Sequence, residues 1–189
     1  MELLEWIRDE HSSTGERFEH GVVDRVPPDR WHDPVGDGGS SLAWLTFHAA
    51  AHEDIAINGV VGAGEPLLAS WRSRLGLDAV PGHIGLGETE VREVSALLDP
   101  VTLLTYARAV PTTTRQWLAT VTPEALSSRP ASAEGLARAG VEESAAPWLY
   151  GMWADRPAWW FVQWEAIGHR INHIGEMVSV RNRLGLSPF

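Results

Sequence analysis

The feature of the sequence that most constrains the fold is the segment from about Pro157 to Leu184, whose pattern predicts one long helix. Proline is favoured in the first turn of a helix, and Gly185 and Pro188 follow the segment as helix-ending residues. No run of alternating apolar and polar residues, which would indicate a strand, occurs anywhere in the sequence. The chain is therefore predicted to be all-α.

The same periodicity predicts further helices, which proline and glycine separate. Long helices are expected over about Glu2–His20, from an N-cap at Ser40 or Ser41 to about Val61, and from Asp99-Pro100 onward with a kink or break at Pro111. Short helices are expected over Pro66–Leu75 and Glu88–Leu98, and the segment Thr122–Gly140 is predicted to be loop with at most one short helix. We therefore expect one domain over residues 1–189, an up-and-down four-helix bundle with short accessory helices.

Composition excludes several classes of function. The chain has no cysteine, which rules out disulfides, thiolate metal sites and a cysteine nucleophile. A net charge of −10 without a Lys/Arg cluster argues against nucleic-acid binding. The sequence shows neither a signal-peptide pattern nor an apolar run long enough to span a bilayer, so the expected location is cytoplasmic, without a membrane partner.

A histidine pair stands out in the last predicted helix. His169 and His173 are four residues apart and so share one helix face, where two imidazoles can bind one cation. Glu176 lies three residues further on and can orient a ligating imidazole or act as a ligand. The pair lacks the glutamate that follows the first histidine in zinc proteases, so peptide hydrolysis is not indicated. Arg170 is expected to face away from the pair, onto the surface.

The second predicted helix carries another such pair, His48 and His52, on its apolar side. Facing helices with inward histidines are a common geometry for metal sites in bundles, whereas the alternative is a set of hydrogen-bonded imidazoles without a metal. The acidic residues Glu53 and Asp54 that follow are either solvated charges or partners of the metal site. The other histidines are expected at the surface or in loops: His11, His20, His32 and His83. A group of tryptophans is expected either to form core and loop packing or to line an apolar pocket: Trp148, Trp153, Trp159, Trp160 and Trp164.

Two stretches of the sequence resemble the DinB superfamily, the helical bundles that include YfiT-like proteins, thiol-dependent S-transferases and maleylpyruvate isomerases. One stretch is Ser41-Leu42-Ala43-Trp44-Leu45-Thr46-Phe47-His48, and the other is His169-x-x-x-His173-x-x-Glu176 followed by Val180-Arg181-Asn182-Arg183-Leu184-Gly185. The order and separation of the predicted helices also fit this family, so the resemblance covers most of the chain.

The resemblance implies a divalent metal held by His48, His169 and His173, with no family role for His52. Zinc is the first choice, and nickel, manganese and iron are alternatives because imidazole binds all of them. The implied activity on a small-molecule substrate is transfer or isomerisation through a low-molecular-weight thiol, or hydrolysis by activated water, with Glu176 as an orienting group. Homodimerisation is implied as well. The alternatives are a non-catalytic bundle with a structural metal and a metal-free bundle that binds an apolar ligand.

Overall fold

The all-α prediction is confirmed by the computed structural model, which describes residues 2–35, 39–80, 84 and 86–189. Within these ranges the regular structure is helical, without a strand. No helix in this part of the chain is long and apolar enough to cross a membrane.

The long helical segments begin and end close to the predicted residues. They are α1 (Leu3–Gly21), α2 (Leu42–Asp54) continued by η3 (Ile55–Val61), α5 (Pro100–Thr120), and α9 (Ala158–Phe161) continued by η4 (Val162–Gly168) and α10 (His169–Arg183). The shorter helices are η1 (Val23–Arg25), η2 (Pro28–Arg30), α3 (Leu67–Trp71), α4 (Glu88–Leu97), α6 (Pro123–Ser127), α7 (Ser132–Arg138) and α8 (Pro147–Trp153). Ser41 caps α2 by accepting a hydrogen bond from the backbone N–H of Trp44, as its position in the sequence predicts.

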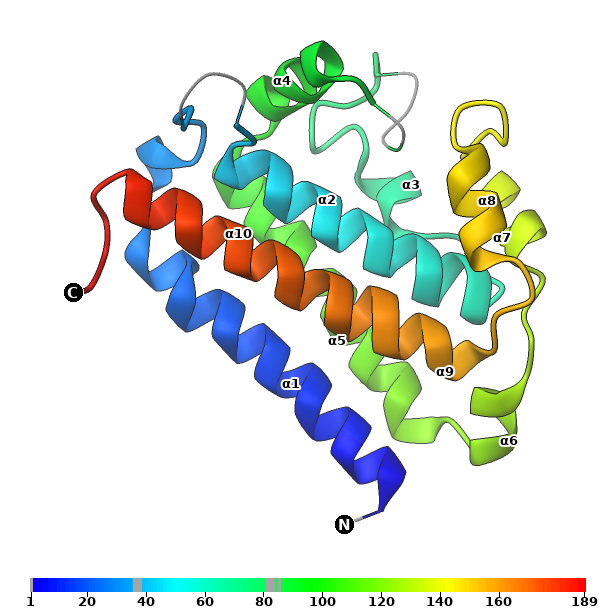
Figure 1. Cartoon of the computed structure of the whole chain (residues 1–189). Helices are drawn as coiled ribbons and strands as arrows, with labels where there is room; N and C mark the ends of the chain where they lie inside the picture. Colours follow the sequence, from blue (N-terminus) through cyan, green and yellow to red (C-terminus); the bar gives the residue numbers. More distant parts are fainter. Residues whose placement is uncertain (1, 36–38, 81–83, 85) are drawn as a thin grey trace.

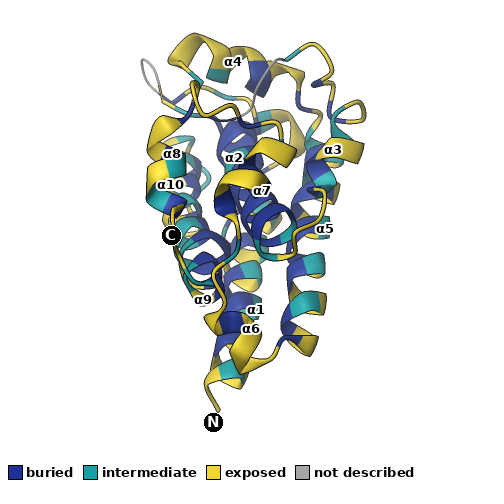
Figure 2. Cartoon of the chain, turned by 90° about the vertical axis from the view of Figure 1, so that its right-hand side faces the viewer, coloured by how far each residue is buried: buried dark blue, intermediate teal, exposed yellow. Residues whose placement is uncertain are grey.

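The long segments pack side by side (Figure 1). Helix α2 contacts both α5 and α10, and α1 contacts both α5 and α10 from the other side. The buried residues face the centre of this arrangement, and the exposed residues line its outer faces (Figure 2). Two apolar clusters fill the interior, one around Phe47 and Tyr106 and the other around Ile55, Trp153 and Phe161.

Two details of the helix prediction were wrong. The segment Thr122–Gly140 holds two short helices, α6 and α7, where at most one was expected, and α8 was not expected. Of the kink or break expected at Pro111, no break forms, since α5 is helical on both sides of this buried proline. The sequence also gave no warning that η3 and η4 are π-helical, with the wider turns that often occur at functional sites.

A buried polar network joins the long helices at their centre. Glu53 on α2 accepts hydrogen bonds at Oε1 from Nε2 of His11 on α1, at 3.0 Å, and from the hydroxyl of Thr114 on α5, at 2.7 Å. Its Oε2 lies 3.1 Å from Nη1 of Arg170 on α10. Burial opposes ionisation of this carboxyl, but the charge of Arg170 and the hydrogen bonds from His11 and Thr114 together lower the pKa of Glu53.

This network corrects several expectations. His11 and Arg170, predicted at the surface, are buried, because each finds in Glu53 a charged partner inside the protein. Glu53 is therefore not solvated, and its contacts are with His11, Thr114 and Arg170 rather than with the histidines expected to bind metal. Asp54 is also buried and serves the fold, since its carboxylate accepts hydrogen bonds from the backbone N–H groups of Leu67 and Leu68 at the start of α3.

We predict that Glu53→Ala destabilises the protein by about 3–5 kcal/mol, because it leaves the Arg170 guanidinium buried without its charged partner. Urea denaturation measures the change. Glu88→Ala is the matched control, since its ion pair with Arg92 is exposed and such a pair contributes about 0–1 kcal/mol. A loss for Glu53→Ala no larger than for this control would contradict the structural role of the network.

Candidate metal centre

Four imidazoles meet between α2 and α10. His48 and His52 lie one turn apart on α2, and His169 and His173 lie one turn apart on α10. Their neighbouring ring centroids are 4.4 to 5.2 Å apart. One nitrogen each from His48, His52 and His169 forms a group in which all the atoms lie within 4.8 Å of one another. The i,i+4 spacing on each helix thus produces one compact cluster of nitrogen donors.

His169 and His173 approach most closely through their ring nitrogens. Nε2 of His169 lies 3.0 Å from Nε2 of His173. Two imidazole nitrogens bound to one tetrahedral zinc ion are about 3.3 Å apart, given Zn–N bonds of about 2.0–2.1 Å. The two nitrogens are within hydrogen-bonding distance of each other, and this separation is also close to the one that a shared cation requires.

A buried carboxylate, that of Glu165, lies next to the cluster on the side that faces the protein interior. Glu165, in η4, is completely buried, and its Oε1 accepts a hydrogen bond from the indole N–H of Trp153 at 2.7 Å. Its Oε2 lies 3.4 Å from Nδ1 of His52 and 3.9 Å from Nδ1 of His169. A carboxylate next to the outer nitrogen of a ligating imidazole fixes the ring's orientation and raises its basicity.

A second carboxylate contacts the cluster at the protein surface. Oε2 of Glu176 lies 2.9 Å from Nδ1 of His173, within hydrogen-bonding distance. The predicted contact between these residues is therefore formed, and it leaves Nε2 of His173 directed at His169. The Glu176 side chain is 57% exposed, whereas that of His173 is only 16% exposed. Glu176 can thus orient His173 while it remains accessible to solvent.

Burial and mutual repulsion keep two imidazoles of the cluster, those of His48 and His169, neutral. Burial lowers the pKa of His48 from 6.5 to about 2, helped by the repulsion of His52, His173 and His169. Burial lowers the pKa of His169 to about 2 in the same way, with His52 and His173 contributing. A neutral imidazole is the form that binds metal ions, so no proton has to leave these two rings when a cation enters.

The residues present fit a bound cation. Both ring nitrogens of His52 and Nδ1 of His169 are buried without a hydrogen-bond partner among the described residues. Such orphaned polar atoms are rare and costly in native proteins unless a ligand, ion or water satisfies them. Clustered imidazoles suit zinc, nickel, copper and iron better than calcium or magnesium, which prefer oxygen ligands.

The structure brings together the histidines of both predicted pairs: His48, His169 and His173, which the resemblance implies as ligands, and His52, to which it gives no role. Sequence reasoning missed Glu165, although its position four residues before His169 was a usable signal. Among the tryptophans, Trp153 is buried beside the site, whereas Trp148 and Trp159 are exposed. His20 and His32 are not buried, and His83 lies outside the described residues.

Comparisons with known proteins give a fold and no activity. No protein-family model matches the chain, and no curated protein matches it in sequence. The chain is similar in structure to a conserved protein from Enterococcus faecalis known from a crystal structure, with a TM-score of 0.71 and 19% sequence identity. The similarity covers 98% of this chain and 99% of that chain. At this identity the likeness establishes a shared helical fold over the whole chain and nothing about chemistry.

We predict that the metal-free protein loses stability as the pH falls from 6.5 to about 5. The unfolded chain takes up protons on His48 and His169 in this range, whereas the folded chain does not, so each contributes a slope of up to about 1.4 kcal/mol per pH unit. Urea denaturation in the presence of EDTA measures this slope. The dependence of the unfolding free energy on pH should become weaker in the double variant His48→Gln/His169→Gln. It should be unchanged in His20→Gln, the control, because His20 is exposed.

Proposed function

We propose that the protein is a metal-dependent enzyme of the DinB type. The observation that carries the proposal is the cluster of four imidazoles, with orphaned nitrogens and closely placed carboxylates, between the second and last long helical segments. The two sequence stretches that resemble the DinB superfamily contain His48, His169, His173 and Glu176 of this site. The similar fold of the Enterococcus faecalis protein covers nearly the full chain. We propose that the long helices of this chain form an up-and-down four-helix bundle.

His48 and His169 belong to both ligand sets that we consider. The resemblance gives His48, His169 and His173, whereas the geometry also groups His48 and His169 with His52. In either set one imidazole of the cluster remains beside the cation as a base or a hydrogen-bond donor. The proposed cofactor is a divalent ion, with zinc as the first choice and nickel, manganese or iron as alternatives.

A bound divalent cation would supply Lewis acidity and lower the pKa of a thiol or water molecule that it contacts. The chain's own residues would orient the ligands and move protons. The Glu165 carboxylate lies next to the rings of His52 and His169 on the buried side, at 3.4 and 3.9 Å, where it would orient them around a cation. Glu176 contacts His173 from the exposed side at 2.9 Å. Because the chain has no cysteine, a thiol-dependent transfer or isomerisation requires a low-molecular-weight thiol as a second substrate.

A second candidate function is a non-catalytic bundle stabilised by a structural metal. The observation that favours it is the limited access to the cluster, because the side chains of His169 and His173 are only 13% and 16% exposed. Four imidazoles can complete a tetrahedral site, and closed sites of this kind are typical of structural zinc. The catalytic proposal instead requires one coordination position open to substrate.

We predict about one divalent ion per chain in protein purified without a metal-affinity tag, measured by elemental mass spectrometry. His48→Ala and His169→Ala should each abolish the stoichiometric metal. His173→Ala should abolish it if the resemblance gives the ligand set, and His52→Ala should do so if the alternative set applies. His32→Ala, a histidine outside the cluster, is the control. Equal metal content in all four cluster variants and the wild type would refute the proposed centre.

The same variants separate catalysis from a structural role. If the metal is catalytic, EDTA should abolish turnover of a thiol-transfer or hydrolysis substrate while the fold, followed by circular dichroism, is retained. If the metal is structural, EDTA should lower the melting temperature strongly, because metal bound only to the folded state stabilises it by mass action. A large fall in melting temperature without turnover of any substrate would favour the second candidate.

A further inference from the structure

The indole of Trp153 contacts both the buried carboxylate and one ring of the imidazole cluster. Trp153 lies on α8, is completely buried, and donates its indole N–H to Oε1 of Glu165 at 2.7 Å. Its ring also meets the ring of His52 edge-on, with the centroids 6.4 Å apart and the planes at 86°. The metal centre proposed above assigns no role to this tryptophan.

The hydrogen bond to Trp153 leaves the second oxygen of Glu165 for the cluster. Oε2 has no hydrogen-bond partner among the described residues, and it lies 3.4 Å from Nδ1 of His52 and 3.9 Å from Nδ1 of His169. The terminal torsion of a glutamate side chain is broad, so the chain by itself does not fix the plane of the carboxylate. The bond from the indole N–H therefore determines how Oε2 faces the two imidazoles.

The positions of the ring nitrogens indicate which atoms are available to a cation. Nδ1 of His52 and Nδ1 of His169 lie next to Glu165, and Nδ1 of His173 lies next to Glu176. The opposite nitrogens, Nε2 of His169 and of His173, are 3.0 Å apart, and Nε2 of His52 is buried without a partner among the described residues. A carboxylate that accepts the Nδ1–H of an imidazole leaves Nε2 as the atom that binds a metal.

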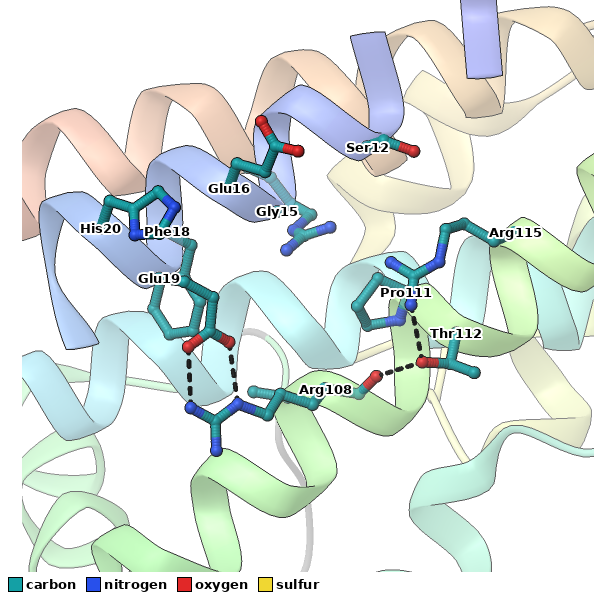
Figure 3. A pocket seen from close by; sticks show the side chains of 12 residues that line it. Ser12, Gly15, Glu16, Phe18, Glu19, His20, Arg108, Pro111, Thr112 and Arg115 are labelled. Carbon is teal, nitrogen blue, oxygen red and sulfur yellow. Dashed lines mark hydrogen bonds and ion pairs between the residues drawn. The ribbon is translucent and has the colours of Figure 1, made fainter. Parts of the chain in front are cut away.

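Glu165 differs from two other carboxylates of the chain in its lack of an arginine partner. Glu53 is paired with Arg170, and in the groove between α1 and α5 Glu19 accepts hydrogen bonds of 2.8 and 2.7 Å from Arg108 (Figure 3). In the part of the chain that the structure describes, only imidazoles lie within ion-pair distance of Glu165. A buried carboxylate without a cationic partner is costly, and a metal ion among the imidazoles would supply the missing positive charge.

We propose that Trp153 is a positioning residue of the metal centre and acts through Glu165. Its indole N–H fixes the carboxylate so that Oε2 orients His52 and His169 by their Nδ1 atoms and leaves Nε2 of each ring available to the cation. This inference rests on the proposed metal centre. It makes metal affinity depend on α8, a helix that carries none of the cluster histidines.

The first test is the zinc affinity of the full chain, measured by competition with a chromophoric chelator. Trp153→Phe keeps an aromatic ring and removes the N–H donor, and we expect it to weaken zinc binding about tenfold, as loss of an outer partner of a ligand does. Trp31→Phe is the matched control, because Trp31 is also buried and its indole N–H bonds to the backbone oxygen of Val26, outside the cluster. The control should change the affinity by less than about twofold.

A double-variant cycle separates positioning through Glu165 from a general loss of packing. Glu165→Gln alone should weaken zinc binding about 10–100-fold. Adding Trp153→Phe to Glu165→Gln should change the affinity by less than about twofold further, because no carboxylate is left to orient. Additive effects of the two substitutions in folded protein would overturn the action through Glu165. Circular dichroism checks the fold of each variant.

A readout on the metal-free protein separates this inference from the proposed function. Nitrogen-15 NMR of the imidazoles, with the His52→Gln and His169→Gln variants for assignment, reports which ring nitrogen carries the proton. We expect the Nδ1–H form for His52 and His169 in the wild type and in Trp31→Phe, and a mixture of forms in Trp153→Phe.

The outcomes then fall apart cleanly. If the wild type binds no zinc but the tautomers respond as expected, the proposed metal centre fails and the positioning by Trp153 stands. If the wild type binds zinc and folded Trp153→Phe binds it like Trp31→Phe, the metal centre stands and this inference is overturned. Nε2–H forms of both rings in the wild type would overturn it whether or not the variants fold.

Discussion

The ion pair between Glu53 and Arg170 is the interaction on which the rest of the structure depends. Glu53 bonds to α1 through His11, to α5 through Thr114 and to α10 through Arg170, so a single carboxylate fixes the relative rotation of the long helices. A buried charge without a partner is costly, so arrangements of the helices that separate Glu53 from Arg170 are disfavoured. The charge of Arg170 and the hydrogen bonds from His11 and Thr114 outweigh the cost of burial here, since the pKa of Glu53 is lowered in spite of complete burial.

The candidate metal centre follows from this arrangement. His52 immediately precedes Glu53, and His169 immediately precedes Arg170, so the ion pair that joins α2 to α10 also sets where these two histidines lie. The π-helical segments begin or end beside the same residues, η3 just after Asp54 and η4 just before His169. Glu165 lies in η4, and its carboxylate is next to His52 on the buried side of the cluster. Polar residues on neighbouring faces of α2 and α10 therefore have two roles. Glu53 and Arg170 hold the two helices together, and the adjacent His52 and His169 form part of the imidazole cluster.

The sequence predicted the features that depend on local patterns. Apolar periodicity and capping residues located α1, α2, α5 and α10, and the i,i+4 spacing of the histidines predicted that each pair shares a face. Prediction from the sequence failed for side chains whose position depends on contacts with residues far away in the chain. Arg170 and His11 look like surface residues until Glu53 is placed between them, and Glu165 looks like an ordinary helix charge until Trp153 and His52 enclose it. The π turns were also beyond prediction, since nothing in their apolar residues distinguishes them from α-helix.

X-ray absorption spectroscopy at the zinc edge, on protein loaded with one equivalent of zinc, tests the central claim most directly. The account predicts a first shell at about 2.0–2.1 Å with the outer-shell scattering of at least three imidazoles, and loss of that pattern in the His48→Ala/His169→Ala variant. A shell of oxygen ligands alone, or the same spectrum in the variant, would mean that the four histidines do not form a metal centre.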